Sequence, residues 1–335
     1  MLTNINRERI IQLVLDHMIK ILLVVMIIAL WIAKSNFMTW GNWMNILRSA
    51  SMKGVVSFGM CMVIFGANVD LSTGSTIALA GVIVAVCCRY LPRMYGEEFR
   101  AMAAVIGICL TVILNFITGF YHAFSTHYFN MPAFIVTMAS TNILYGAAGM
   151  LSGGENIANI YPDWFLNMGM GRVPNTQTGI PIPVIILLVV FSITYFLMNY
   201  TTTGRAIFAT GGNQEAARLS GINVFRAKVV FFVAVQLMAS LGGLINSAQL
   251  ASGSFTYGKE WGTDIISAVV IGGTPMGGGV GTVFGTLIGI LFIGVLSNGM
   301  TILSFSVYSQ FLVRGCVLFG SVYFAALKVT YARKN

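Results

Sequence analysis

Two carboxylates and one guanidinium are the groups most able to do chemistry within the long apolar runs of this chain. Asp70 lies in GANVDLSTGS, between the apolar stretches FGMCMVIF and TIALAGVIVAV; Asp264 opens TDIISAVVIGG, and Arg314 lies in an apolar segment near the C-terminus. Ionisable groups in such surroundings are costly, and they mark solute paths, proton relays or paired structural sites. The surrounding residues therefore decide which role each group has.

Asp70 is best explained by a break in a helix. Gly66 and Gly74 permit a turn, while Asp70, Ser72 and Ser75 offer hydrogen-bond partners to the helix that restarts after the turn. We therefore interpret Asp70 as a cap and positioning group of a discontinuous helix near 66–75. A proton carrier is the alternative role.

A second segment resembles this one at a constant spacing of 207 residues. VIFGANVDLSTGSTIALAG (63–81) aligns without gaps to VIGGTPMGGGVGTVFGTLI (270–288), and the second copy has Gly277 in the place of Asp70. Paired glycine-interrupted apolar segments are typical of a transport path. We expect a second discontinuous helix near 272–281, containing Gly273 and Gly277.

The composition identifies the solvent around these breaks. Hydrophobic residues make up 57% of the 335 residues and charged residues 9%, whereas soluble domains carry roughly 25% charged residues. Apolar segments near the ~20 residues that cross a bilayer recur along the chain. They lie at 19–33, 54–67, 71–88, 101–120, 132–149, 180–198, 228–247, 263–276, 281–297 and 308–327. The expected fold is an all-α, polytopic transmembrane helical bundle of about ten spans, forming a single transmembrane domain over 1–335.

Several functions are disfavoured by what the chain lacks. It has no GxxxxGK[ST] phosphate-binding loop, and His122 and His127, five residues apart, fall on different helix faces, so no metal site is predicted. Ser152 lies near Glu155, but nothing places a histidine beside them for hydrolysis. The net charge of +9 fits cytoplasmic loops anchored at a membrane better than nucleic-acid binding.

Charged residues outside the apolar segments predict the orientation. Lys and Arg cluster near both termini and in the loop 199–228, and such clusters favour the cytoplasmic side of a membrane. Both termini and that loop are therefore expected in the cytoplasm of a bacterium. Segment 150–180 is expected outside with some local structure, and 34–53 as an amphipathic segment at the interface, anchored by Trp40 and Trp43.

One glycine pattern predicts helix packing. In GTVFGTLIG, Gly281, Gly285 and Gly289 recur at every fourth residue. This spacing places them on one helix face, where a neighbouring helix can approach closely.

The loop 199–228 contains a short predicted helix. In NQEAARLSG, Asn213 is a good N-cap and Gly221 a good stop signal, with helix-forming residues between them. The loop has two interpretations. It is a solvated connector between spans, or its short helix between glycines is a docking site for a soluble partner.

The loop GRAIFATGGNQEAARLSGINV resembles the cytoplasmic loop of the permease subunits of ribose/galactose-type sugar ABC importers, in the superfamily of branched-chain amino acid and sugar permeases. VDLSTGSTIALAG, GTDIISAVVIGGTPMGGGVGTVFGTLIG and YSQFLVRG resemble the same family in the same order, from about residue 40 to the C-terminus.

The resemblance implies a non-catalytic subunit of an ATP-driven importer that moves a monosaccharide into the cytoplasm across the inner membrane. Its implied partners are a cytoplasmic ABC ATPase, an extracytoplasmic sugar-binding protein and a second permease copy, in a homodimer or heterodimer. This chain would bind no cofactor, because ATP and Mg²⁺ lie on the ATPase. The implied coupling residues are Gly212, Asn213, Glu215, Ala216, Ala217, Arg218 and Gly221.

Three alternatives stay open. An ion-coupled secondary transporter would need Asp70, Asp264 or Arg314 as its coupling group. Asp264 is either an acid in a first helical turn, which the helix dipole favours, or a group on the solute path together with Asp70, Ser72, Gly74, Gly273 and Gly277. Arg314 either extends to the outer interface or pairs with a polar group inside the dimer.

Overall fold

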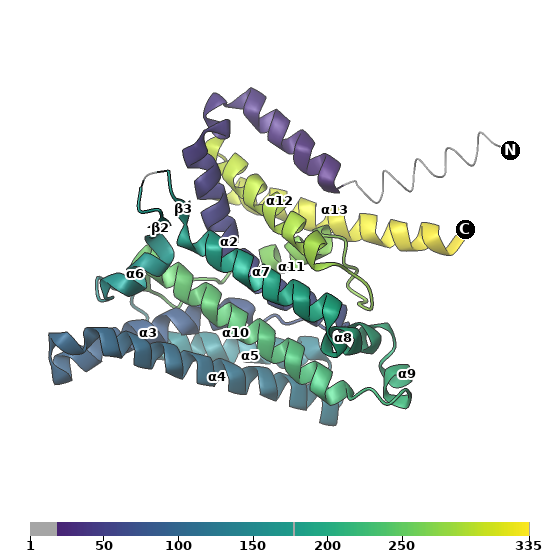
Figure 1. Ribbon diagram of the computed structural model, residues 1–335, viewed down its shortest axis with the longest axis horizontal. Helices are drawn as coiled ribbons and strands as arrows, with labels where there is room; N and C mark the ends of the chain where they lie inside the picture. Colours follow the sequence, from purple (N-terminus) through teal and green to yellow (C-terminus); the bar gives the residue numbers. More distant parts are fainter. Residues whose placement is uncertain (1–18, 177, 335) are drawn as a thin grey trace.

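The computed structural model describes residues 19–176 and 178–334. Within them the chain is an all-α bundle (Figure 1), as the composition predicts. A helix lies on each of the ten predicted apolar segments. These helices are Ile19–Ala33, α2 (Trp40–Phe65), α3 (Thr73–Tyr95), α4 (Arg100–Tyr128), α5 (Ala133–Ser152), α7 (Ile182–Tyr200), α10 (Val224–Leu250), α11 (Trp261–Ile271), α12 (Val283–Ile302) and α13 (Val307–Lys334).

The helices differ in how far they can span. Among the described residues, seven helices are long and apolar enough to cross a membrane, namely α2, α3, α4 with the short η2 (Glu97–Phe99) before it, α5, α7, α10 and α12. Ile19–Ala33 and α11 are apolar but shorter. Interruptions lie at both predicted positions, because α2 stops at Phe65 with α3 starting at Thr73, and α11 stops at Ile271 with α12 starting at Val283. The first interruption connects two helices that are each long enough to span, whereas the second follows the short helix α11.

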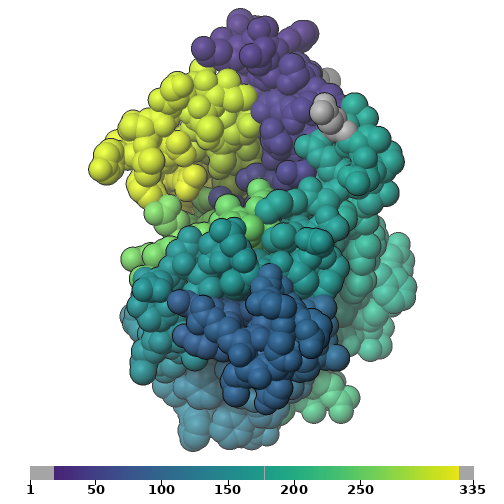
Figure 2. Space-filling model, turned by 90° about the vertical axis from the view of Figure 1, so that its left-hand side faces the viewer, coloured from purple at the N-terminus to yellow at the C-terminus, as the bar shows by residue number. Residues whose placement is uncertain are grey.

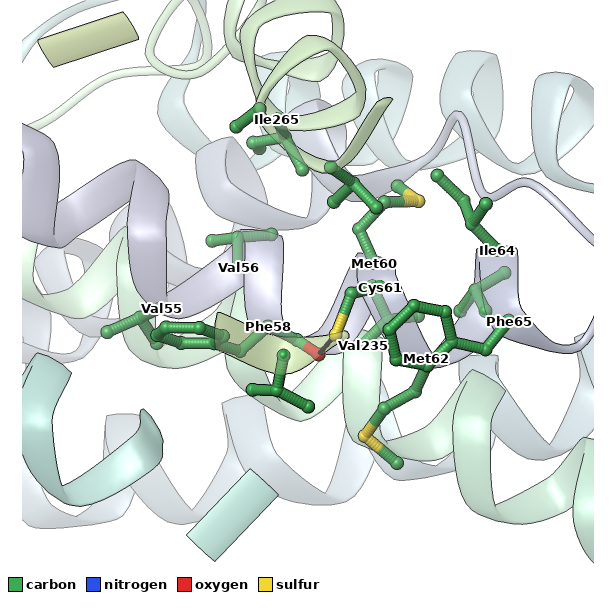
Figure 3. Packing of buried hydrophobic residues seen from close by; sticks show 14 of the residues in the cluster. Val55, Val56, Phe58, Met60, Cys61, Met62, Ile64, Phe65, Val235 and Ile265 are labelled. Carbon is green, nitrogen blue, oxygen red and sulfur yellow. Dashed lines mark hydrogen bonds between the residues drawn. The ribbon is translucent and has the colours of Figure 1, made fainter. Parts of the chain in front are cut away.

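The core forms where α2 and α10 cross. These two helices pack against each other. In addition, α10 contacts α3 and α4, and α2 contacts α7, α11 and α12. Figure 3 shows Val55, Phe58 and Met62 of α2 beside Val235 of α10, all of them buried. A helix that is buried on all sides needs apolar residues around its whole circumference, which explains the unbroken apolar run before Gly66.

The predicted interfacial segment 34–53 is wrong for most of its length. Only the short helix η1 (Ser35–Met38) precedes Trp40, and residues 40–53 form the first half of α2. Thr39 caps the helix by accepting a hydrogen bond from the backbone N–H of Asn42, and the Asn42 side chain exchanges hydrogen bonds with Asn298. Asn42 of this segment therefore faces α12, while Asn45 and Ser49 are exposed.

The two ends of the bundle differ in structure. At one end lie the start of Ile19–Ala33, the end of α13 and the helices α8 (Thr202–Gly212) and α9 (Gln214–Leu219) (Figure 1). At the other end lie α6 (Asp163–Met170) and the paired strands β2 (Arg172–Val173) and β3 (Ile180–Pro181). Figure 2 views this second end, with the α3–α4 turn in front. Strand β1 (Ile157–Ala158) pairs with β4 (Ser252–Gly253), so segment 150–180 has the local structure that we expected.

Glycine contacts between α11 and α12 only partly follow the predicted pattern. A Cβ atom on Gly289 would lie 1.8 Å from the backbone oxygen of Ala268, and one on Gly285 would lie 2.2 Å from that of Gly272. Gly281 precedes the helix, because Thr282 is the N-cap of α12, and its Cβ would meet the Phe65 ring. The three glycines therefore do not share one helix face, although two of them allow the close approach.

The contact at Gly289 predicts a selective loss of stability. Gly289→Ala forces α12 away from α11 and is expected to lower the free energy of unfolding by about 1–3 kcal/mol, the usual cost of overpacking. Gly146→Ala is the matched control, because a Cβ at this position in α5 meets nothing within 4 Å. Thermal unfolding in detergent compares the two variants, and equal melting temperatures would contradict the assigned contact.

Candidate functional site

The first helix break is held by a turn at Ala67. Ala67 has a left-handed backbone with φ of 56°, whereas Gly66 has φ of −78° and Gly74 is already within α3. Gly66 lies in the turn as the C-cap of α2, as predicted, but the prediction is wrong for Gly74. Their lack of a side chain serves packing, because a Cβ on Gly66 would lie 2.6 Å from the Phe231 ring. A Cβ on Gly74 would lie equally close to the backbone oxygen of Gly258.

Asp70 binds the start of α3 and a distant helix. Its Oδ1 accepts hydrogen bonds from the backbone N–H of Ser72 at 2.8 Å and from the Ser72 hydroxyl at 2.6 Å. Its Oδ2 accepts one from Nε2 of Gln236, on α10, at 2.7 Å and lies 3.4 Å from Nδ1 of His122 on α4. Asp70, His122 and Gln236 are all fully buried. This carboxylate therefore joins the break to two spanning helices.

The network extends beyond the carboxylate. His122 Nε2 lies 2.8 Å from the Ser140 hydroxyl on α5, and the Thr76 hydroxyl donates to Gln236 Oε1 at 2.6 Å. Ser75 bonds back to the Ser72 carbonyl at 2.8 Å. Sequence reasoning did not assign His122, Gln236 or Ser140 to this site. Each of these three residues is a polar side chain among apolar neighbours, which could have marked it as a site residue. The neighbouring sequence gave no reason to pair any of them with Asp70.

The second break lies directly against the first. The Gly279 N–H donates to the Phe65 carbonyl at 2.9 Å, and a Cβ on Gly278 would lie 2.5 Å from the backbone nitrogen of Ala67. Gly278 and Gly279 both have left-handed backbones, with φ of 68° and 76°. The predicted residues Gly273 and Gly277 are in the same loop, but a Cβ on either would meet nothing within 4 Å.

The end of α8 completes this contact. A Cβ on Gly211 would lie 1.9 Å from the Phe65 carbonyl oxygen and 2.8 Å from the Gly279 nitrogen. The rings of Phe65 and Phe208 stack with centroids 4.8 Å apart. We name this meeting of Phe65–Ala67, Gly211–Gly212 and Gly278–Gly279 the glycine junction. Sequence reasoning missed Gly211, Gly278 and Gly279, which only a tertiary contact distinguishes from their neighbours.

The predicted short helix follows the junction immediately. Asn213 caps α9 by accepting a hydrogen bond from the Ala216 N–H at 2.9 Å, and Gly221, with φ of 81°, follows its end. The predicted range Asn213–Gly221 thus comprises the cap, α9 and the stop residue. Ala217 is buried against the bundle, while Glu215 and Arg218 are exposed.

The exposed charges of α9 pair with each other. Arg218 donates two hydrogen bonds to Glu215, at 2.6 and 3.0 Å. The hydrogen bond from Arg218 lowers the pKa of Glu215, so the carboxylate is ionised at neutral pH. An exposed pair of this kind adds little stability and stays available to a partner.

Asp264 lies apart from Asp70, in the first turn of α11. Its Oδ2 is 2.5 Å from Nζ of Lys53 on α2 and 3.8 Å from Nη1 of Arg314 on α13. The first-turn position fits the helix-dipole interpretation, but the closest partners of the carboxylate are these two cations. Arg314 therefore pairs within its own chain. Lys53, which the sequence placed in a loop, is in the middle of α2.

With this geometry in place, comparison with known proteins gives the family. Residues 42–322 match the family model described as the permease component of a branched-chain amino acid transport system. The chain belongs to this permease family. The match covers both helix breaks, α9 and the Lys53–Asp264–Arg314 cluster, so each of these features is part of the family's domain and none is an appendage.

Individual relatives of this permease are sugar permeases by name. The ribose import permease protein RbsC of Escherichia coli K12 is 35% identical over 305 residues, covering 89% of each chain. Its counterpart in Haemophilus influenzae is 34% identical over 306 residues, covering 90% of each. The xylose transport system permease protein XylH of Escherichia coli K12 is 29% identical over 367 residues, covering 91% of this chain and 90% of the relative. No solved structure was found to match the chain.

The Asp70 network predicts a graded loss of stability. Asp70→Ala leaves the Ser72 N–H and one of the two Gln236 amide donors without an acceptor, and we expect the free energy of unfolding to fall by about 2–4 kcal/mol. Asp70→Asn keeps one acceptor oxygen for Ser72 and is expected to lose less. Denaturant titration in micelles measures both variants. A larger loss for asparagine than for alanine would contradict the assigned hydrogen bonds.

Proposed function

We propose that this permease is the membrane subunit of an ATP-driven importer that moves a monosaccharide of the ribose/galactose type into the cytoplasm. The observation that carries the mechanism is the glycine junction. Gly212, in the junction, is joined through Asn213 to α9, and the junction touches both helix breaks. A displacement of α9 therefore reaches both breaks within a few residues, because packed backbone atoms cannot absorb it.

In the proposal, a separate ATPase subunit supplies the energy for transport. The sequence has no phosphate-binding loop, so ATP and Mg²⁺ belong to a cytoplasmic ABC ATPase, and this chain is a non-catalytic subunit. In the proposal, α9 docks on the ATPase and moves when ATP closes it, and the path then opens to an extracytoplasmic sugar-binding protein. A second permease copy, in a homodimer or heterodimer, completes the path.

The orientation in the proposal follows from charge and from the arrangement of the ends. The start of Ile19–Ala33, the end of α13 and α9 lie at the same end of the bundle (Figure 1). Lys and Arg gather in the same regions of the sequence, and positive residues favour the cytoplasm. In the proposal, both termini and α9 are on the cytoplasmic side of a bacterial inner membrane, and α6, β2 and β3 are on the opposite side.

Charge reversal on α9 tests the docking. Glu215→Lys is expected to abolish co-purification of the ATPase and ATP-dependent uptake of ribose into vesicles, because Arg218 would then face a like charge at the docking surface. Glu98→Lys is the matched control, since Glu98 is exposed in the α3–α4 turn at the opposite end. Retained coupling in Glu215→Lys would overturn the docking role. Uptake that needs no ATPase and stops when a proton ionophore is added would instead indicate a secondary transporter.

Substitution at the glycine junction tests transmission separately from docking. Gly211→Ala places a methyl group against the Phe65 carbonyl, and we expect uptake to fall at least tenfold while the ATPase still binds. Gly146→Ala adds the same methyl group within α5, where nothing lies within 4 Å, and it should leave uptake within twofold. Equal uptake by the two variants would show that the junction does not transmit the movement.

A further inference from the structure

An open groove lies between the first turns of α2 and the hairpin of β2 and β3, at the end of the bundle opposite α9. Its volume is about 660 Å³, and its lining residues are Gly41, Asn45, Met170, Arg172, Asn175 and Thr176. Trp40 holds the hairpin to α2, because its indole Nε1 donates a hydrogen bond to the Thr178 carbonyl at 3.0 Å. Figure 2 views this end of the bundle, where the hairpin in teal borders the start of α2 in purple. The groove therefore has room for far more than a water molecule.

The lining of the groove is positively charged. Arg172 is the charged residue among the six that line it, and these six include no Asp or Glu. The side-chain amides of Asn45 and Asn175 and the hydroxyl of Thr176 add neutral hydrogen-bond donors. A set of donors around a guanidinium suits an anionic ligand.

A second guanidinium lies on the same side of α2. Arg48 follows Gly41 by two helical turns and Asn45 by one, so these three residues share one helix face. Among the described residues, Arg48 has no ion pair with a carboxylate, and its buried Nε has no hydrogen-bond partner. Its Nη2 lies 3.5 Å from the Met170 carbonyl oxygen, and its charge interacts with that of Arg172. Two neighbouring cations repel each other, and an anion beside both offsets this cost.

The start of α2 is expected at the level of the lipid headgroups. This spanning helix has 26 residues, and its length of about 39 Å at ~1.5 Å per residue is close to the ~40 Å of a bilayer with its headgroups. Trp40, the first residue of α2, is 55% exposed, and exposed tryptophan at the end of a spanning helix is typical of the headgroup region. The groove starts at the next residue, Gly41.

The hairpin beside the groove has one polar and one apolar face. Val173 and Ile180 are paired across its two strands, and both side chains are exposed. Consecutive strand residues point to opposite faces, so Arg172 lies on the face away from this apolar pair. A basic groove next to exposed apolar side chains fits a lipid, whose headgroup and acyl chains meet at this boundary, better than it fits a wholly polar ligand.

We propose that this groove binds the headgroup of an anionic phospholipid, with Arg48 and Arg172 on the phosphate oxygens. Guanidinium groups bind phosphate through two parallel hydrogen bonds, which suits a site with two arginines. Asn45, Asn175 and Thr176 bind the headgroup hydroxyls. The site is independent of the transported solute and of the ATPase. The lipid joins the hairpin to the start of α2, the helix whose other end is in the glycine junction.

Native mass spectrometry of the full-length chain in micelles tests the site, with phosphatidylglycerol and phosphatidylcholine as the probes. We expect the double variant Arg48→Gln, Arg172→Gln to bind phosphatidylglycerol at least fivefold more weakly and phosphatidylcholine as before. Arg93→Gln is the matched control, because Arg93 is an exposed arginine in the last turn of α3, at the same end of the bundle. It should change the affinity less than twofold. An equal loss in the control would show that binding follows the net charge, and it would overturn the site.

A second variant blocks the groove without removing a charge. Gly41 lines the groove, and a Cβ at this position meets nothing within 4 Å, so Gly41→Leu places a side chain in the space that the headgroup needs. Its melting temperature should not fall, since leucine favours a helix more than glycine does. We expect the same fivefold loss of phosphatidylglycerol affinity, and unchanged affinity would overturn the proposal.

Two competitors separate a lipid from other anions. We expect neither inorganic phosphate nor a hexaglutamate peptide, each at the concentration of the lipid, to displace phosphatidylglycerol. Displacement by phosphate would assign the groove to a free anion, and displacement by the peptide would assign it to an acidic protein surface. Either result would overturn the lipid site.

Discussion

A helix that ends inside a packed bundle leaves its last carbonyl groups, and the first N–H groups of the next helix, out of reach of water, and this constraint governs the structure. Buried backbone groups then need hydrogen-bond partners from the protein itself. The chain stops two helices in this way, after Phe65 and after Ile271. It satisfies part of the need by placing the two breaks against each other, with the Gly279 N–H on the Phe65 carbonyl.

This solution explains why glycine gathers at the junction. Backbone atoms of three separate segments approach more closely than any Cβ allows, as the 1.9 Å distance from a Cβ on Gly211 to the Phe65 carbonyl oxygen shows. The same close contact joins α8 to both breaks. Because Asn213 both ends α8 and caps α9, the helix α9 follows the junction directly.

Sequence reasoning predicted local features well and tertiary partners poorly. The break near 66–75, the break near 272–281 and the cap at Asn213 each depend on neighbouring residue types, and the structure has all three. The partners of Asp70 are 52 and 166 residues away, at His122 and Gln236, where nothing local marks them. Lys53 was misplaced in a loop because the first half of α2 is polar. Two of its polar residues have distant partners that the sequence does not mark, since Asn42 bonds to Asn298 and Lys53 pairs with Asp264.

The two buried carboxylates, Asp70 and Asp264, have different surroundings. Asp70 is fully buried, and its partners are Ser72 at the start of α3, Gln236 on α10 and His122 on α4. Each of these contacts holds a helix in place. Asp264 is also buried, but its two cations reach the outside of the chain and exceed the charge that the carboxylate can neutralise. The Asp70 network joins the first break to α4 and α10 within one buried site and stabilises the fold. The Asp264 cluster lies at the edge of the single chain, where the exposed parts of Lys53 and Arg314 remain in reach of water.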